Sequence, residues 1–284
     1  MNVVRMIADV RHAVHEARAR GAAIGFVPTM GAFHAGHLSL MRSARAQTGL
    51  VVVSVFVNPA QFNNLTDLSA YPRDEARDAA MAAAEGADVF FAPTAGEVYP
   101  DGFATAVTVA GLSKPLCGAF RGPEHFQGVA TVVTKLFNIV APDVAFFGQK
   151  DAQQALIVRR LVRDLDLSVR VEVCPTVRES DGLAMSSRNV RLDARERVRA
   201  LALQHGLQVA TAAIENGARD GTRVAELARG AMRDRGVEAE YFELVSAESL
   251  CPVTPLVGEI LIAVAAHVGP VRLIDNVLVR VPPL

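Results

Sequence analysis

Residues 50–57, LVVVSVFV, constrain the fold of this chain more than any other stretch. Valine dominates the run, and a single polar residue, Ser54, interrupts it. A strand without polar alternation is typical of the centre of a parallel sheet, where helices cover both faces. Asn58-Pro59 follows, and the strand ends there because proline cannot donate a hydrogen bond to a sheet. The run therefore predicts an α/β protein with a parallel sheet.

Apolar strand-like runs alternate with helical stretches up to about residue 176. We expect strands at 24–27, 50–57, 88–91, 144–147 and 169–173, with helices beginning at 38 and covering 74–85, 131–140 and 152–165. This order is that of a parallel sheet with crossover helices. Residues 1–176 are therefore expected to form a Rossmann-like domain that binds its ligands.

The pattern changes after Pro175. Asp193 and Glu196 have capping-box spacing, which predicts the start of a long helix. That helix is expected to end near 217, a second to run from 222 toward 236, and strands to cover 241–245, 259–264 and 272–281. Residues 177–284 are therefore expected to form a smaller α+β domain.

Composition argues against several classes of partner and site. The 284 residues carry a formal net charge of −1 with scattered basic residues, so neither nucleic acid nor an anionic membrane is the expected main partner. The apolar runs are too short to cross a bilayer, and charges interrupt the N-terminal stretch where a signal peptide would be apolar. Cys117, Cys174 and Cys251 are odd in number and lack metal-ligand spacing. We expect a cytoplasmic protein with no protein-held metal.

The sequence PTMGAFHAGH at residues 28–37 follows an expected strand and leads into an expected helix. Glycines there let the backbone approach a phosphate, a helix start offers unpaired N–H groups, and His34 and His37 can face one anion. The alternative is a core histidine or a helix cap. His12 and His15 share this spacing but lack the glycines, and the charged helix around them predicts a solvated face.

A second stretch with phosphate chemistry is MSSR at residues 185–188, in a loop that contains Gly182. Arginine gives permanently charged, bidentate hydrogen bonds to phosphoryl oxygens, and serine hydroxyls donate to developing charge. Taken alone, the stretch is more typical of an ordinary polar loop.

Residues 148–151, GQKD, stand at another strand-to-helix turn. Lysine occurs in this chain only at 114, 135 and 150, so Lys150 at a sheet edge indicates that a compact point charge is wanted there. Asp151 suits either a helix cap or a ribose hydroxyl.

Amide side chains follow two of the expected strands. Asn58 and Gln61 come after the central strand, and Gln153 and Gln154 begin the helix after Lys150. Amides can bind the hydroxyl and carboxylate groups of a polar substrate without fixed charge, although surface glutamines are common. His125 is expected to bound the site from a loop.

With these segments in order, the chain resembles the pantoate–β-alanine ligase (pantothenate synthetase) family of the HIGH-motif nucleotidyltransferase superfamily. The motifs that carry the resemblance are PTMGAFHAGHLSL at 28–40, VFVNPAQF at 55–62, YPR at 71–73, HF at 125–126, FGQKD at 147–151 and PTVRESDGLAMSSRN at 175–189. They span most of the first domain and the segment that follows it.

The resemblance implies ATP-dependent condensation of pantoate with β-alanine through a pantoyl adenylate, in pantothenate biosynthesis on the coenzyme A pathway. It implies a homodimer, with ATP and Mg²⁺ required. The implied ATP-binding residues are Met30, Gly31, Ala32, Phe33, His34, Ala35, Gly36, His37, Gly148, Gln149, Lys150, Asp151, Val177, Met185, Ser186, Ser187 and Arg188.

The same resemblance implies that Gln61 and Gln154 bind pantoate and that Gln61 also lies near β-alanine. It also implies that His37 is the catalytic histidine. The residues themselves add Asn58 as a substrate contact and His34, Lys150 and Arg188 as groups that stabilise charge. The chain has one more residue between Arg121 and Phe126 than the family commonly shows, so no role is assigned to Arg121.

Two other functions fit the same motifs. One is a nucleotidyltransferase that stops after nucleotidyl transfer, without ligation. The other is a non-catalytic nucleotide-binding or RNA-binding module, which the absence of a basic face disfavours.

Overall fold

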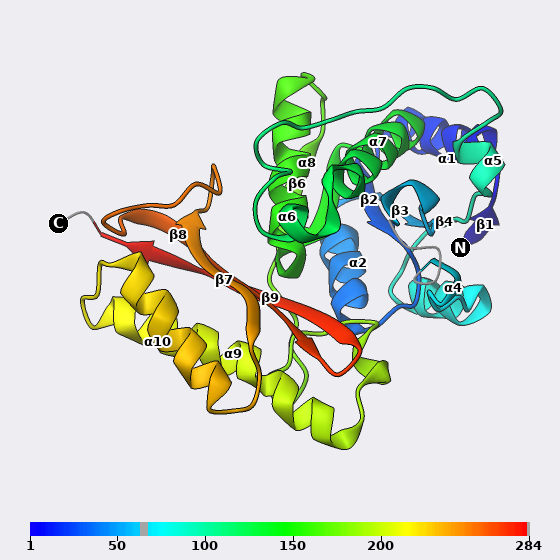
Figure 1. Ribbon diagram of the computed structural model, residues 1–284. Helices are drawn as coiled ribbons and strands as arrows, with labels where there is room; N and C mark the ends of the chain where they lie inside the picture. Colours follow the sequence, from blue (N-terminus) through cyan, green and yellow to red (C-terminus); the bar gives the residue numbers. More distant parts are fainter. Residues whose placement is uncertain (63–67, 283–284) are drawn as a thin grey trace. The chain divides into compact units, whose positions relative to one another are not determined.

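The chain folds into two compact units in a computed structural model that describes residues 1–62 and 68–282 (Figure 1). The first unit holds residues 1–114, 118–149 and 153–175. The second begins at Thr176 and also includes the short segments 115–117 and 150–152. Lys150 is therefore counted with the second unit, although the strand before it and the helix after it belong mainly to the first.

The first unit is built on a six-stranded parallel sheet in the order β1-β4-β3-β2-β5-β6. The strands are β1 (Asn2–Val4), β2 (Ile24–Thr29), β3 (Leu50–Val55), β4 (Val89–Phe91), β5 (Val144–Gly148) and β6 (Arg170–Cys174). Residues 50–54 of β3 are buried, as the valine-rich run predicts. The expected strands are confirmed, and the three-residue β1 was too short to show a pattern.

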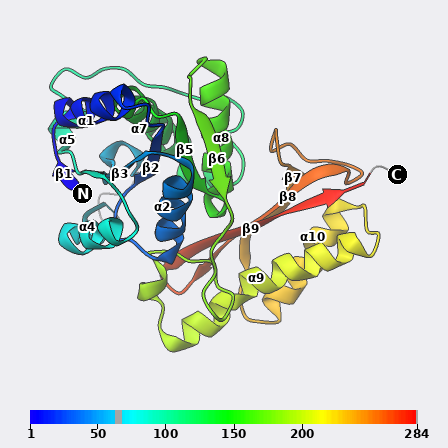
Figure 2. The same cartoon turned by 180° about the vertical axis from the view of Figure 1, so that it is seen from behind.

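Helices cover both faces of this sheet (Figures 1 and 2). They are α1 (Ile7–Ala19), α2 (Ala35–Gln47), α4 (Glu75–Ala84), α5 (Ala95–Val98), α6 (Cys117–Arg121), α7 (Pro123–Val140) and α8 (Ala152–Asp164). On one face α1 packs against α7, and on the other α2 packs against α4. Right-handed crossovers require this division, because the connections run along the sheet in opposite directions.

Two helix starts differ from expectation. α2 begins at Ala35 rather than at residue 38, so the second glycine and histidine of the motif are helical. α7 begins at Pro123 rather than at residue 131, which places His125 in a helix and makes the expected loop position wrong. Gly128 obscured the helical pattern, and a Cβ there would lie 2.3 Å from the Ala60 carbonyl oxygen. The glycine lets α7 contact the segment after β3.

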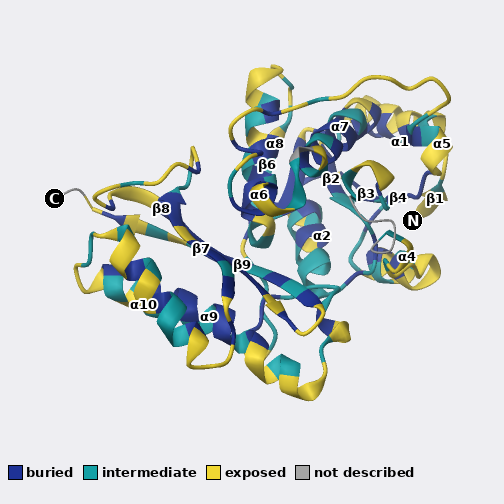
Figure 3. Ribbon diagram, viewed as in Figure 1, coloured by how far each residue is buried: buried dark blue, intermediate teal, exposed yellow. Residues whose placement is uncertain are grey.

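The second unit is an antiparallel sheet with two helices. Its strands β7 (Ala239–Ser246), β8 (Gly258–Val268) and β9 (Val271–Val281) pair in sequence order, and α9 (Ala194–Glu215) and α10 (Gly221–Arg233) pack together against them. Its buried core is dark blue in Figure 3 and includes Leu203, Met232, Phe242 and Ile262. A Cβ at Gly206 of α9 would lie 2.9 Å from the Met232 side chain, so glycine permits the close helix packing. The expected α/β fold with a smaller α+β unit is confirmed.

Two simpler expectations concern membranes and cysteines. Across residues 1–62 and 68–282, no helix is both long and apolar enough to cross a membrane. The three cysteines lie within the described residues and form no disulfide. Burial raises the pKa of the Cys174 thiol, which lowers its thiolate fraction at neutral pH.

The capping box at the start of α9 gives a stability prediction. The Asp193 carboxylate accepts from the N–H groups of Arg195 and Glu196, both at 2.8 Å, and Glu196 returns a bond to the Asp193 N–H. We expect Asp193→Ala to lower the free energy of unfolding by about 1 kcal/mol in urea denaturation, because these N–H groups lose their acceptor. Asp193→Asn keeps an acceptor and should lose less; equal losses for both variants would contradict the capping explanation.

Candidate functional site

The motifs PTMGAFHAGH and GQKD lie at the ends of neighbouring strands of the parallel sheet. β2 lies between β3 and β5, and the chain leaves β2 and β5 in opposite directions along the sheet. Ligands of open α/β sheets bind outside the carboxyl ends of strands at such a switch point. Met30 follows β2, Gly148 ends β5, and Asn58 follows β3, so all three stand at this edge.

His34 and His37 cap the start of α2. His34 Nδ1 accepts from the Gly36 N–H at 3.1 Å, and His37 Nδ1 accepts from the His34 N–H at 3.4 Å. Accepting at Nδ1 puts the proton of each neutral imidazole on Nε2, and the two ring centroids are 4.2 Å apart. The two histidines therefore do cap the helix, as the alternative predicted, and the same geometry makes both Nε2 atoms donors.

The turn before α2 is held by Asp78 of α4, a residue that sequence reasoning missed. Asp78 is buried, and its two carboxylate oxygens accept from the N–H groups of Ala32 and Phe33 at 2.7 and 2.8 Å. Gly31 and Ala32 both have positive φ, of 83° and 54°. Such a turn is costly for Ala32, and the carboxylate stabilises it. An aspartate in an alanine-rich helix 46 residues away gives no local signal of this role.

These bonds change which groups of residues 31–37 can meet a phosphate. The N–H groups of Gly31, Ala32, Phe33, Gly36 and His37 all donate within the protein. The expectation of unpaired N–H groups at this helix start is therefore wrong for Gly36 and His37. Phe33 is buried in the core with Phe90, so its side chain contributes packing. These five N–H groups therefore hold the turn and the helix start together.

Asn58 orients Gln61 after β3. The Asn58 amide donates to Gln61 Oε1 and to the Gly128 carbonyl, both at 3.1 Å, and its oxygen accepts from the Ala60 N–H and the Tyr99 hydroxyl. These four bonds use both amide hydrogens and both acceptor positions of Asn58. Burial raises the pKa of Tyr99 to about 12, so its phenol stays protonated and donates.

Gln61 is also held by contacts with Met30 and His125. Its side-chain Nε2 lies 3.1 Å from Met30 Sδ, and its main-chain carbonyl oxygen lies 2.8 Å from His125 Nδ1. Because a carbonyl only accepts, His125 Nδ1 is the donor in this pair. The structure thus joins Met30 after β2 to the amide after β3, and His125 supports the backbone of Gln61 from α7.

The two glutamines of α8 differ in their surroundings. Gln153 is buried and donates to the Leu112 carbonyl at 2.8 Å, which is a structural contact. Gln154 is half-buried in the first turn of the helix that follows β5. Gln154 is therefore the member of the pair whose side chain is partly accessible.

A pocket of about 270 Å³ opens at the carboxyl ends of β2, β3 and β4. Met30, Gly31 and Asp78 contribute to its wall, together with Arg5 and Arg73. Arg5 binds both carboxylate oxygens of Glu75, at 2.7 and 3.1 Å, and this hydrogen bonding lowers the pKa of Glu75. Of the predicted site residues, only Met30 and Gly31 line this pocket.

The turn after β5 places a lysine beside an aspartate. Residues 149–151 form a short 3₁₀ helix, η2 (Gln149–Asp151), in which Lys150 Nζ lies 3.7 Å from Asp151 Oδ1. The Lys150 side chain is 19% exposed and that of Asp151 is 50% exposed. A Cβ built on Gly148 meets no atom within 4 Å, so the backbone is open at that point.

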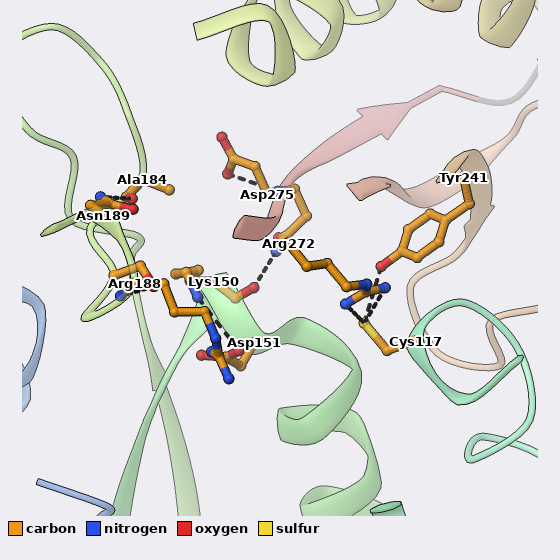
Figure 4. Close-up of polar contacts among 11 residues, drawn as sticks. Cys117, Lys150, Asp151, Ala184, Arg188, Asn189, Tyr241, Arg272 and Asp275 are labelled. Carbon is orange, nitrogen blue, oxygen red and sulfur yellow. Dashed lines mark hydrogen bonds and ion pairs between the residues drawn. The ribbon is translucent and has the colours of Figure 1, made fainter. Parts of the chain in front are cut away.

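The MSSR stretch is presented by a hairpin of the second unit. Met185 N–H donates to the Val177 carbonyl, and Glu179 N–H donates to the Leu183 carbonyl, which fixes residues 177–185 as a hairpin. Ser186 Oγ accepts from the Arg188 N–H at 3.2 Å, and the Asn189 amide donates to Glu179. The same amide donates to the Ala184 carbonyl (Figure 4). A hydroxyl oxygen that accepts one hydrogen bond can still donate its own hydrogen to another group.

The predicted residues thus divide between the two units. Residues 30–37, 148–149, Gln61 and Gln154 belong to the first, and Lys150, Asp151, Val177 and residues 185–188 belong to the second. His12 and His15 lie exposed on α1, with His12 3.5 Å from Glu16, which confirms the solvated helix face predicted for them.

Comparison with known proteins gives one family over nearly the whole chain. A family model described as pantoate-beta-alanine ligase matches residues 2–278. A pantothenate synthetase of Cereibacter sphaeroides is 53% identical over 276 residues, which cover 97% of this chain and 98% of that protein.

Two solved structures agree with this family. Pantothenate synthetase from Thermus thermophilus has a TM-score of 0.92 and 44% identity, with 100% of each chain covered. Pantoate-beta-alanine ligase from Francisella tularensis, complexed with beta-gamma ATP and beta-alanine, has a TM-score of 0.81 and 33% identity, covering 98% of this chain and 97% of that one.

The Asp78 contacts predict a linked effect on stability and nucleotide binding. Asp78→Asn replaces one acceptor oxygen by an NH₂ group that faces an N–H donor, so we expect the free energy of unfolding to fall by about 1–3 kcal/mol. The loosened turn should also raise the Kd for ATP about tenfold in isothermal titration, which corresponds to about 1.4 kcal/mol.

The matched control is Asp74→Ala, which removes the N-cap of the same helix without touching the turn. It should lower stability while leaving the Kd for ATP unchanged. Asp78→Asn with wild-type ATP affinity would show that the turn needs no carboxylate.

Proposed function

The chain belongs to the pantoate–β-alanine ligase family, and we propose that it is the ATP-dependent ligase that condenses pantoate with β-alanine. The match of the family model to residues 2–278 carries this conclusion. The Francisella relative, solved with beta-gamma ATP and beta-alanine, supports ATP and β-alanine as substrates. The comparisons support ligation and neither a nucleotidyltransferase without ligation nor a non-catalytic module.

The proposed reaction has two steps. A pantoate carboxylate oxygen attacks the α-phosphorus of ATP in line, which gives pantoyl adenylate and releases pyrophosphate. The β-alanine amine then attacks the acyl carbon, forms the amide of pantothenate and releases AMP. Negative charge develops on phosphoryl oxygens in the first step and on the acyl oxygen in the second, so positioned cations and donors supply most of the acceleration.

In the first unit, the proposed roles follow from hydrogen-bonding capacity. The Nε2 donors of His34 and His37 stabilise charge on the phosphates, because both Nδ1 atoms are used in the cap of α2. Gln61 and Gln154 bind the hydroxyl and carboxylate groups of pantoate. Asn58, whose hydrogen-bonding positions are filled by protein groups, positions Gln61 in place of the direct substrate contact expected from sequence.

In the second unit, Lys150 and Arg188 supply positive charge to the phosphates. The planar Arg188 guanidinium suits two oxygens of one phosphoryl group, and the Lys150 ammonium suits a single oxygen. The hydroxyls of Ser186 and Ser187 add neutral donors, and Asp151 suits the ribose hydroxyls. Mg²⁺ enters with ATP as part of the substrate, since hard cations of this size prefer phosphate oxygens and water.

The proposal extends to a cytoplasmic homodimer on the route to coenzyme A. The resemblance to the family supports the dimer, and cysteines without disulfides suit a reducing compartment. Sedimentation equilibrium of the purified chain measures the oligomeric state directly.

We predict that His37→Ala lowers adenylate formation by about two to three orders of magnitude, the effect of losing one preorganised donor to developing charge. Pyrophosphate release under single turnover measures this step. The matched control is the double variant His12→Ala, His15→Ala, which removes two exposed histidines of the same spacing and should be kinetically silent. A folded His37→Ala variant with nearly wild-type turnover would remove His37 from the mechanism.

The adenylate route is tested with isotope. Pantoate labelled with ¹⁸O in its carboxylate should deliver one labelled oxygen to AMP, because the attacking oxygen stays on phosphorus when the amide forms. Mass spectrometry of AMP and pantothenate, with each substrate omitted in turn, measures the transfer. Unlabelled AMP throughout would exclude the adenylate, and a dinucleotide-like product without pantothenate would favour transfer without ligation.

A further inference from the structure

Asp275 and Asn276, adjacent residues of β9, contact both polypeptide segments that carry the proposed phosphate-binding cations of the second unit. Both are buried, at 4% and 5% exposure, and the other residues of this strand are largely apolar. Neither belongs to a motif that marked the site in the sequence. Buried polar residues on a strand are held by specific hydrogen bonds, and here those partners lie on the two ligand-binding segments.

Asp275 is bonded to the base of the hairpin that presents Arg188. Its carboxylate accepts from both terminal nitrogens of Arg178, at 2.7 and 3.0 Å, in a bidentate pair. Arg178 Nη1 also donates to the Gly182 carbonyl at 3.0 Å. The backbone of Arg178 forms an antiparallel β-bridge with that of Ala184 across the hairpin. One ion pair thus joins β9 to both strands of the hairpin whose end continues into residues 185–188.

Asn276 is bonded to the other cationic segment. Its Nδ2 donates to the Lys150 carbonyl at 2.9 Å, and its own N–H donates to Asp275 Oδ1 at 2.8 Å (Figure 4). Lys150 stands in the three-residue 3₁₀ helix η2, and this contact restrains its main chain. Side chains of adjacent strand residues point to opposite faces, which lets β9 hold one segment on each side.

We propose that Asp275 and Asn276 are positioning residues that fix the spacing between Lys150 and Arg188. The inference rests on the proposed function, because it assumes that these two cations meet the same nucleotide. Asn276 acts through the main chain of Lys150, and Asp275 acts through Arg178 and the hairpin. Neither residue touches the reacting atoms, and their contribution is to keep two charges at a distance that matches the phosphate chain.

The experiment is a pair of double-mutant cycles on the full-length chain. Asn276→Ala should lower kcat about tenfold to a hundredfold, since a displacement of about 1 Å at a catalytic group has effects of this size. The KM for pantoate should stay within about twofold, because pantoate is given to residues of the first unit. In the Lys150→Ala background the same substitution should lower kcat by less than about twofold, because the group that Asn276 positions is already lost.

The second cycle tests the contact of Asp275 with Arg178. It keeps the proposal testable if Asn276→Ala does not fold. Arg178→Lys retains the charge opposite Asp275 but loses the planar fork that also reaches Gly182. It should lower kcat in the wild-type background and have little further effect in Arg188→Ala. Leu273→Val is the matched control, a buried apolar residue of the same strand, and should lower Tm without lowering kcat.

The outcomes distinguish a failure of the positioning role from a failure of the proposed function. Non-additive effects in either cycle support the positioning role. Equal factors in both backgrounds, or unchanged kcat in folded Asn276→Ala and Arg178→Lys variants, would overturn it while wild-type activity upholds the proposed function. A wild-type chain that makes no pantothenate would overturn both.

Discussion

The neighbouring positions of β2 and β5 in the parallel sheet are the constraint on which the rest of the first unit depends. Since the chain leaves these strands in opposite directions, the helices after them cannot close over the gap between their carboxyl ends. The paired histidines follow β2 and the GQKD turn follows β5, so a topological rule places two chemically distinct segments at one edge. The amide after β3 stands beside them for the same reason.

Internal hydrogen bonds determine what this edge can offer to a ligand. Asp78 holds the N–H groups of the turn after β2, and the histidine cap uses those at the start of α2. Asn58 is likewise saturated by protein partners. These internal bonds fix the backbone, and in the proposed function recognition falls to the imidazoles and to the Gln61 amide. Such preorganisation suits a reaction in which no protein nucleophile is needed.

The second unit applies the same principle to charged groups. Arg178 and Asp275 form a bidentate pair in which the aspartate side chain is 3% exposed, and such a pair holds its geometry well because both hydrogen bonds must form together. The hairpin before the MSSR stretch has its own main-chain hydrogen bonds, and the Asn189 amide donates another to the Ala184 carbonyl. Arg197 adds ion pairs to Glu179 and Asp181 of that hairpin, at 2.6 and 2.8 Å. The loop that carries Arg188 is therefore a supported element of the unit.

Sequence alone determined most of the elements and the reaction class of this protein. The valine run at 50–57, the glycine-histidine turn and the Asp193–Glu196 capping box each act within a few residues, so local pattern reveals them. Family resemblance through these motifs was sufficient for the reaction class. What only the tertiary structure decided is which polar groups remain available to a ligand. Asp78 reaches Ala32 across 46 positions, and Asn276 reaches Lys150 across 126. Contacts at such separations depend on how strands and helices pack, and no periodicity or motif in one stretch of sequence records them.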